Sequence, residues 1–190
     1  MTPTPDAPRR KSEPRNRLLR TATEVFYSKG IHSVGIEEIV EKAQITRSTL
    51  YRHFPSKEDL VVGYLEAVSD YEAQHFTAAL TPDQDPEDGV RALARAVAAQ
   101  VQDPGFRGCA FLNAAAEYPD AEHPVRRAIA EHRGWFADLV RSAFGRLEGD
   151  RAARAELFVL LRDGAMSGGC VGNPTEVAAT FLAGVERLLA

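Results

Sequence analysis

The chain has 190 residues, of which 44% are hydrophobic and 26% are charged. This balance is typical of a globular protein with a buried core, and it excludes a mainly disordered, collagen-like or membrane-spanning chain. Charge is unevenly divided, because residues 1–60 carry eleven basic and eight acidic side chains whereas residues 61–190 carry twelve and nineteen.

The first twelve residues contain three prolines and a basic cluster but no apolar run, so they do not predict a signal peptide. No stretch of the chain reaches the roughly 18 apolar residues that cross a bilayer. We therefore expect a cytoplasmic protein without a membrane partner, which begins with a disordered basic arm at residues 1–13.

Helical segments follow one another from residue 14 onward. Prolines, which helix interiors exclude, separate blocks rich in Ala, Leu, Arg and Glu, and no block shows the period-2 alternation of a strand. Capping signals mark helix starts, such as Ser56 followed by Asp59, and Asp85 before Pro86. The sequence predicts an all-α protein with these helices: 14–29, 36–43, 47–53, 57–80, 86–102, 108–118, 124–147, 151–170 and 174–189.

Residues 36–54 have the spacing of a helix-turn-helix, with two short helices on either side of a tight turn. Apolar residues of the two helices would form a small core. The outer face of the second helix then holds seven residues that can hydrogen-bond a phosphate or a base edge: Thr46, Arg47, Ser48, Thr49, Tyr51, Arg52 and His53. The helix has no acidic residue, as contact with phosphates requires, whereas a plain exposed helix favours Glu and Lys.

Further residues between positions 15 and 65 extend this motif at fixed spacing: Leu18, Ala22, Phe26, Gly30, Ile36, Ile39, Ala43, Thr49-Leu-Tyr-Arg-His-Phe54 and Ser56-Lys57-Glu58-Asp59-Leu60. At these positions the chain resembles the TetR family of bacterial one-component transcriptional regulators. The resemblance implies a three-helix DNA-binding domain with a helix-turn-helix at 14–56 and a helical bundle for ligand binding and dimerisation at 57–190. It also implies a palindromic operator in double-stranded DNA, and repression as the usual mode of control.

The resemblance implies a role for each polar residue of the second helix and for the lysine that follows it. Three residues would reach base edges in the major groove: Thr46, Arg47 and Ser48. Four would hold phosphates: Thr49, Tyr51, His53 and Lys57. Arg52 could do either. The alternatives are packing of the Tyr51 ring against the first helix, a capping role for His53 and a plain surface charge for Lys57.

The turn departs from the family's pattern at Gln44, where members usually have glycine. A non-glycine residue must then carry the φ angle of the turn, which implies a small backbone strain.

Eight polar or aromatic residues that interrupt apolar helical faces are candidates for an effector pocket: Tyr71, His75, Phe111, Asn113, His132, Trp135, Phe136 and Met166. Each has a plainer interpretation, because an aromatic stripe at helical spacing is usually core and a histidine on an apolar face is usually a hydrogen-bonded core residue. The acidic balance of residues 61–190 disfavours polyanions. We therefore expect an unidentified small effector that is largely apolar and neutral or cationic.

Of the last two predicted helices, 174–189 carries an apolar stripe and 151–170 offers further apolar residues. Two such helices from each of two chains would close a four-helix interface with two-fold symmetry. The sequence therefore predicts a homodimer through these helices.

The sequence offers no catalytic residue, metal site or cofactor site. Its five histidines lack metal-ligand spacing, and no glycine-rich phosphate loop follows a strand. We interpret Cys109 and Cys170 as buried thiols, with oxidant sensing as the alternative. The alternative function is a helical DNA-binding or interaction protein without a small-molecule effector.

Overall fold

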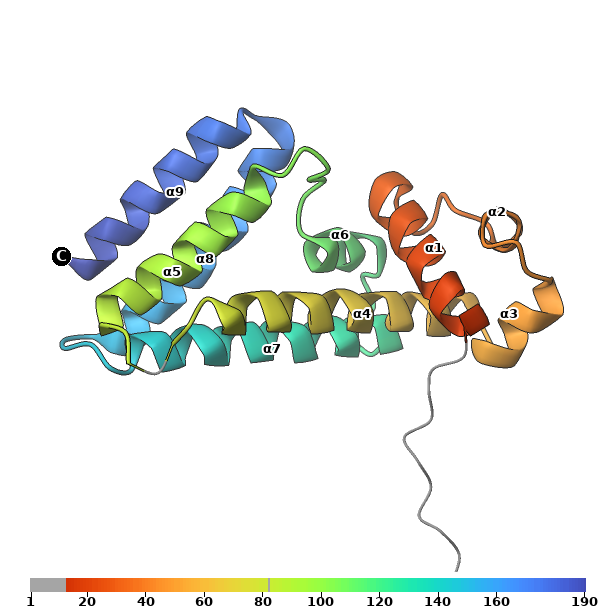
Figure 1. Ribbon diagram of the computed structural model, residues 1–190, viewed down its shortest axis with the longest axis horizontal. Coiled ribbons are helices and arrows are strands. Elements are labelled where there is room, and N and C mark those ends of the chain that lie inside the picture. The colour runs from red at the N-terminus through yellow and green to blue at the C-terminus, as the bar shows by residue number, and fades with distance from the viewer. Residues whose placement is uncertain (1–12, 82) are drawn as a thin grey trace, which may run out of the picture. The chain divides into compact units, whose positions relative to one another are not determined.

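The computed structural model describes residues 13–81 and 83–190 (Figure 1). Within these ranges every regular element is a helix, which confirms the all-α class. The helices are α1 (Glu13–Lys29), α2 (Ile36–Lys42), α3 (Arg47–His53), α4 (Lys57–Ala78), α5 (Pro86–Val101), α6 (Ala110–Glu117), α7 (Pro124–Phe144), α8 (Arg151–Val171) and α9 (Pro174–Leu189). The predicted basic arm lies outside the described residues except for Glu13, which begins α1.

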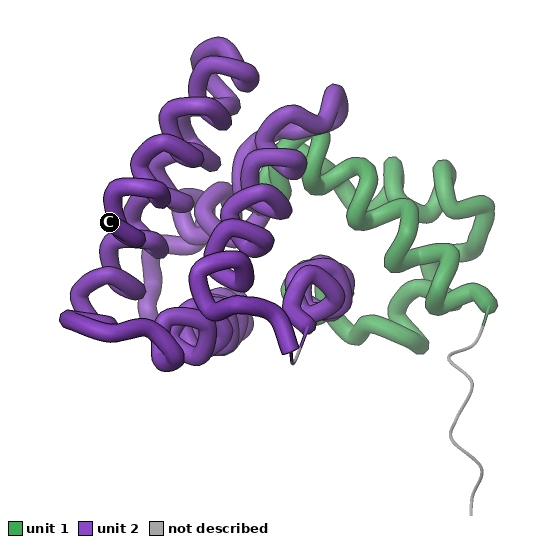
Figure 2. Tube along the Cα trace, turned by 60° about the vertical axis from the view of Figure 1, so that its left-hand side comes forward, with its two compact units in different colours: residues 1–64 green, residues 65–190 purple. Residues whose placement is uncertain are grey.

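The chain divides into two compact units, residues 1–64 and 65–190 (Figure 2). The division falls inside α4, which is therefore shared by both units. None of the described helices combines the length and the apolar character that a bilayer crossing requires.

In the first unit, α1, α2, α3 and the start of α4 surround a small apolar core that includes Leu18, Ala22, Phe26, Ile39, Leu50, Phe54 and Leu60. Gly63 allows α4 to lie close to this core, because a Cβ atom there would be 2.9 Å from the ring of Phe54. Gln44 has a φ angle of 52°. The strain expected from the missing glycine is thus present in the turn between α2 and α3.

In the second unit, α5 packs against α9 and α7, and α8 packs against α7 and α9. Edge-to-face contacts link three buried rings, with centroid distances of 6.0 Å from Phe144 to Phe158 and 5.7 Å from Phe158 to Phe181. Helix α7 ends at Phe144 rather than at the predicted residue 147, and its last helical hydrogen bond runs from the Gly145 N–H to the Arg141 carbonyl.

Candidate nucleic-acid interface and interior polar cluster

Helix α3 begins at a threonine cap. The Thr46 hydroxyl accepts a hydrogen bond from the backbone N–H of Thr49 at 3.2 Å and lies 2.9 Å from the hydroxyls of Ser48 and Thr49. Threonine is a good N-cap because its side-chain oxygen replaces a missing carbonyl partner. Thr46 therefore fixes the start of the helix in addition to any contact that it makes with a ligand.

The two sides of α3 differ as the sequence predicted. Leu50 and the following Phe54 are buried, whereas Arg47, Ser48, Tyr51 and Arg52 are exposed. Thr49, His53 and Lys57 are half-buried. The exposed side of α3 presents hydroxyls and guanidinium groups without a carboxylate of its own.

Arg47 has an acidic neighbour that α3 itself does not supply. Its Nη1 atom lies 2.7 Å from the Glu37 carboxylate on α2, and its guanidinium lies 5.7 Å from the centroid of the Tyr51 ring. Hydrogen bonding to Tyr51, followed by the charge of Glu37, raises the pKa of Arg47. Both groups are exposed, so water screens this pair and Arg47 can exchange Glu37 for another partner.

The start of α4 is held by the predicted capping box. Ser56 accepts from the backbone N–H of Asp59 at 3.0 Å, and Asp59 accepts from the backbone N–H of Ser56 at 3.0 Å. Lys57 follows in the first turn, with its ammonium 6.0 Å from the centroid of the Phe26 ring. This geometry fixes the base of the Lys57 side chain close to the end of α3.

The eight candidate effector residues do not form one group. Tyr71 and His75 are exposed and stack on each other with ring centroids 6.3 Å apart. Asn113 is also exposed and donates to the Arg107 carbonyl at 3.0 Å, so its role is to hold the loop before α6. The expectation that these three residues lie in the interior is wrong, because each lies on the side of its helix that faces solvent.

The other candidates lie closer together. Phe111, His132, Phe136 and Met166 are buried, and Trp135 is half-buried. The His132 ring stacks on Phe111 with a centroid distance of 3.5 Å and an interplanar angle of 3°. The Nδ1 atom of His132 lies 3.0 Å from the Ser69 hydroxyl. His132 is thus a core histidine with a hydrogen-bond partner.

The structure places charged groups next to His132 that the sequence analysis did not select. Glu72 of α4 and Arg162 of α8 are only 3% and 2% exposed. The Oε2 atom of Glu72 lies 3.3 Å from His132 Nε2 and 3.8 Å from Arg162 Nη2, and Gln100 of α5 donates to Glu72 Oε1 at 2.9 Å. We call Glu72, His132 and Arg162 the interior polar cluster.

Burial and charge oppose each other in this cluster. Burial favours the neutral form of Glu72, but its close contact with His132 and the charge of Arg162 outweigh burial and lower the pKa of Glu72. Burial likewise disfavours the charge on Arg162, but its interactions with Cys109 and Glu72 outweigh burial and raise its pKa. The cluster is therefore an ion pair in the interior of the second unit.

The two cysteines differ in exposure. Cys109 is buried, as predicted, and its sulfur accepts a hydrogen bond from Arg162 Nη1 at 3.4 Å. Cys170 is exposed, so its interpretation as a buried thiol is wrong. It lies near the end of α8, on the side that turns away from the core. Within residues 13–81 and 83–190, no three His, Cys, Asp or Glu side chains are grouped so that they could hold a metal ion.

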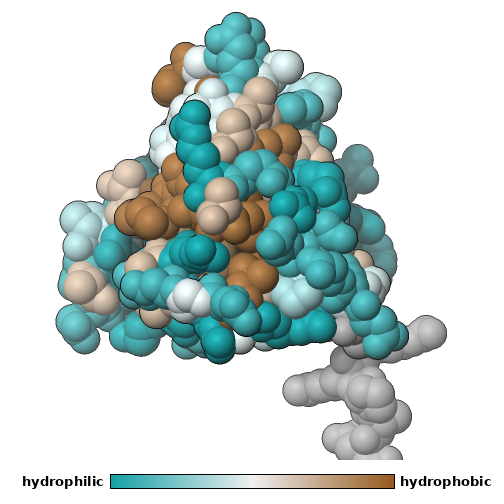
Figure 3. All heavy atoms as spheres, turned by 90° about the vertical axis from the view of Figure 1, so that its left-hand side faces the viewer, coloured by the Kyte–Doolittle hydropathy of each residue, from teal (hydrophilic) through white to brown (hydrophobic). Residues whose placement is uncertain are grey.

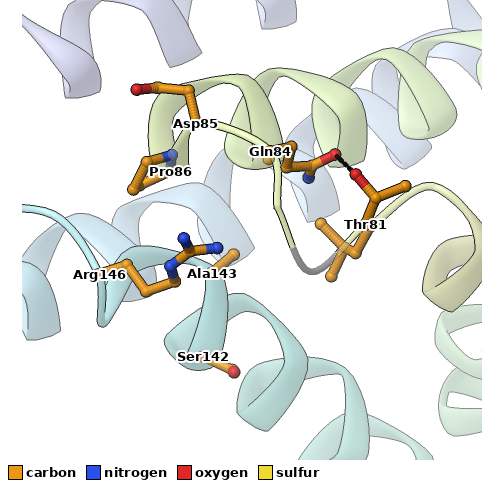
Figure 4. Close-up of a pocket in the computed structure, with 9 residues that line it drawn as sticks. Thr81, Gln84, Asp85, Pro86, Ser142, Ala143 and Arg146 are labelled. Atoms are coloured by element: carbon orange, nitrogen blue, oxygen red, sulfur yellow. Dashed lines mark hydrogen bonds between the residues drawn. The ribbon is translucent and has the colours of Figure 1, made fainter.

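Three hollows bear on ligand binding. The smallest, about 10 Å³, adjoins the interior polar cluster. A surface pocket of about 270 Å³ lies where α5 begins and α7 ends, and Figure 4 shows the Thr81 hydroxyl hydrogen-bonded to the Gln84 amide oxygen there. A second surface pocket, of about 320 Å³, lies between α7 and α8. None of the eight candidate residues is among the described residues that line the two surface pockets.

Helix α8 also carries apolar side chains that face solvent. Leu157, Leu160 and Val171 are 47%, 66% and 89% exposed. Figure 3 shows apolar side chains gathered in the middle of one face of the molecule, with hydrophilic side chains around them. Exposed apolar patches are a usual feature of surfaces that bind another molecule.

Comparison with known proteins agrees with this architecture. Residues 18–63 match the family described as bacterial regulatory proteins, tetR family, and residues 86–155 match the tetracyclin repressor-like C-terminal domain. A solved structure of SCO4454, a TetR-family transcriptional regulator from Streptomyces coelicolor, is 50% identical with a TM-score of 0.90. That match covers 93% of this chain and 94% of SCO4454.

Two curated relatives match over shorter stretches. The HTH-type transcriptional activator FasR of Mycolicibacterium smegmatis is 34% identical over 45% of this chain and 39% of its own length. The HTH-type transcriptional regulator TcmR of Streptomyces glaucescens is 30% identical over 55% of this chain and 48% of its own length. The chain thus spans less than half of these two regulators.

Proposed function

The chain belongs to the TetR family of bacterial regulatory proteins, and on this premise we propose that it is a ligand-responsive repressor that binds a palindromic operator as a homodimer. The family consists of transcriptional regulators rather than enzymes. The observation that carries the proposal is the exposed side of α3, where Arg47, Ser48, Tyr51 and Arg52 face solvent and no carboxylate of α3 accompanies them. Operator binding also implies a cytoplasmic protein.

The recognition residues divide by what they would contact. Arg47 and Ser48 lie in the first turn of α3 with Thr46 as its cap, which is the end of a recognition helix that reads base edges. Tyr51 and Lys57 offer a hydroxyl and an ammonium to phosphates. Arg47 must exchange its bond with Glu37 for a base edge, so the acceptors of guanine must outcompete an exposed carboxylate.

The homodimer would use the exposed apolar side of α8. The apolar side chains of Leu157, Leu160 and Val171 are exposed to solvent in the single chain. A second copy of α8 and α9 would cover them. Two-fold symmetry then presents two recognition helices to successive major grooves, about one helical turn or somewhat more apart.

The effector would act through α4, because this helix is shared by both units. Its first turn holds the Ser56–Asp59 capping box beside α3, and its later turns supply Glu72 to the interior polar cluster. A tenfold loss of operator affinity needs a coupling free energy of about 1.4 kcal/mol between effector and DNA.

The direction of control is the part of the proposal that needs a transcription assay. The FasR relative is named an activator, whereas another relative, KstR2 of Mycolicibacterium smegmatis, is named a repressor. A reporter gene downstream of the operator distinguishes repression from activation. Adding the regulator lowers expression of the reporter if it is a repressor and raises this expression if it is an activator.

The test of DNA recognition starts with duplexes selected from a random pool by the purified protein. Arg47→Ala should weaken binding to the selected site by about tenfold to a hundredfold and relax its sequence preference. Lys57→Ala should weaken binding to all DNA sequences alike and reduce the slope of log affinity against log salt concentration by about one. Arg95→Ala, which removes an exposed arginine from α5, is the matched control and should leave both unchanged. An unchanged affinity in Arg47→Ala would contradict the assignment of α3.

A further inference from the structure

The hollow beside the interior polar cluster has an unusual lining. Three of the residues that line it are apolar, namely Phe111, Phe136 and Val159. The other three are basic or carry an imidazole, namely His132, Arg133 and Arg162. No carboxylate is among the described residues that line it, although Glu72 lies 3.8 Å from Arg162 and Asp163 lies 2.7 Å from Arg133. The side that faces into the hollow is therefore basic, in contrast to the acidic balance of the unit as a whole.

One edge of Arg162 has no hydrogen-bond partner. Its Nη1 atom donates to Cys109 and to Asp163, at 3.4 and 3.1 Å. Its Nε and Nη2 atoms are buried without an acceptor. The Glu72 Oε2 atom, which is also without a donor in hydrogen-bond geometry, lies 3.8 Å from Nη2, too far for a hydrogen bond. Buried N–H groups of a guanidinium are costly to leave unpaired. The Nε–Nη2 edge is also the edge that holds a carboxylate through two parallel hydrogen bonds.

The rings around this edge favour a flat apolar group next to the carboxylate. The guanidinium of Arg162 lies 5.1 Å from the centroid of the Phe136 ring. Phe111, which also lines the hollow, stacks directly on His132. A ligand body placed there would contact aromatic faces on two sides.

We propose that the second unit binds a small aromatic monocarboxylate whose carboxylate is held by the Nε and Nη2 atoms of Arg162. The proposal rests on the proposed function, since this ligand would be the effector. It differs from the sequence-based expectation of a neutral or cationic compound, because the ligand is an anion. His132 also lines the hollow, and its Nε2 atom lies 3.3 Å from Glu72 Oε2.

The ligand needs more room than the described conformation provides. A hollow of about 10 Å³ holds a single water molecule at most. Phe111 is the wall carried by the shortest helix of the unit, α6, and the chain enters α6 through Gly108, whose φ angle is +91°. Movement of the Phe111 ring away from His132 would leave a planar space of the size of one aromatic ring above the imidazole.

The experiment compares benzoate and phenylacetate with benzamide and phenylacetamide, which match them in shape but lack the charge. Isothermal titration and thermal unfolding of the wild-type protein should give a Kd for each acid at least tenfold lower than for its amide. Arg162→Lys keeps the charge but removes the two parallel donors, and it should abolish most of this preference.

Phe111→Ala keeps the proposal testable if Arg162→Lys folds poorly. It removes the ring that blocks the hollow, so benzoate should bind more tightly than to the wild type while its preference over benzamide remains. Equal affinities for acid and amide in both the wild type and Phe111→Ala would overturn the proposal, as would an acid preference that survives Arg162→Lys in the folded protein.

Operator binding is measured separately, so the two proposals can fail independently. Benzoate binding that leaves operator affinity unchanged would overturn the effector role of this ligand. A protein that binds benzoate through Arg162 but selects no DNA would overturn the proposed function and support the carboxylate site.

Discussion

Replacement of Arg162 by methionine tests whether the interior polar cluster is an ion pair. Methionine keeps the unbranched apolar stem but leaves Glu72, which is 3% exposed, without its cation. The cheapest response is for Glu72 to take up a proton. From an ordinary pKa of 4.5, protonation at pH 7 costs about 3.4 kcal/mol, since each pH unit is worth about 1.36 kcal/mol. A loss of about 3–4 kcal/mol also agrees with the usual cost of breaking a buried ion pair.

The assay is urea unfolding followed by circular dichroism at a fixed protein concentration, at pH 7 and at pH 5. At pH 5 protonation of Glu72 costs only about 0.7 kcal/mol, so the loss in Arg162→Met should shrink by between 2 and 3 kcal/mol, roughly. The double variant Glu72→Gln, Arg162→Met is the control and should recover most of the loss at pH 7. A loss below about 1 kcal/mol at pH 7, or one that does not change with pH, would refute the reasoning.

The remaining predictions concern pH, packing, recognition and assembly. The pKa of Glu72 is lowered by folding, so its contribution to stability is present above about pH 4.5 and is lost as the pH falls further; Glu72→Gln should flatten this part of the stability curve. Gly169→Ala should lower the free energy of unfolding in urea by about 1–3 kcal/mol, since its Cβ would lie 2.5 Å from a methyl group of the buried Val101. Gly168→Ala, whose Cβ would lie 3.4 Å from a methyl group of Val177, should leave this free energy unchanged or raise it. Glu37→Gln should free Arg47 and raise operator affinity severalfold in a titration at low salt. Leu160→Glu should shift light scattering from the mass of a dimer to that of one 20.8 kDa chain.

The helices could be predicted because local chemistry determines where each one starts. Pro86, Pro124 and Pro174 each occupy the first position of a helix, behind the caps Asp85, His123 and Asn173. These signals act over a few residues and need no knowledge of the fold. Helix ends were less certain, as in α7, because a helix without a strong stop signal ends where tertiary packing allows.

The exposed side of α3 could be predicted for a similar reason. Leu50 and Phe54 are spaced by one helical turn, and once they are assigned to the core the polar residues must face outward. The bond from Arg47 to Glu37 could not be predicted in this way, because it joins two helices across a turn whose geometry depends on the positive φ angle of Gln44.

Two members of the interior polar cluster, Glu72 and Arg162, were not predicted, although the sequence holds a signal for them. Arg162 lies four residues after Phe158 and four before Met166, so helical periodicity places it on the buried side of α8. Glu72 likewise lies four residues before the buried Phe76 on α4. A charged residue on a buried helical face requires a partner, and the sequence alone does not reveal which helix supplies it.

The acidic balance of residues 61–190 and the lining of the hollow lead to opposite expectations about the charge of the effector, for a physical reason. Exposed charges are screened within about 10 Å at ordinary salt, so most of the acidic side chains contribute little to the potential inside the unit. A bound ligand responds to groups within a few ångströms in a medium of low dielectric constant, where each interaction is several times stronger than in water. At the proposed carboxylate site the open donors of Arg162 would outweigh the surplus of surface carboxylates, and the sign of the ligand charge would follow the groups that the ligand touches.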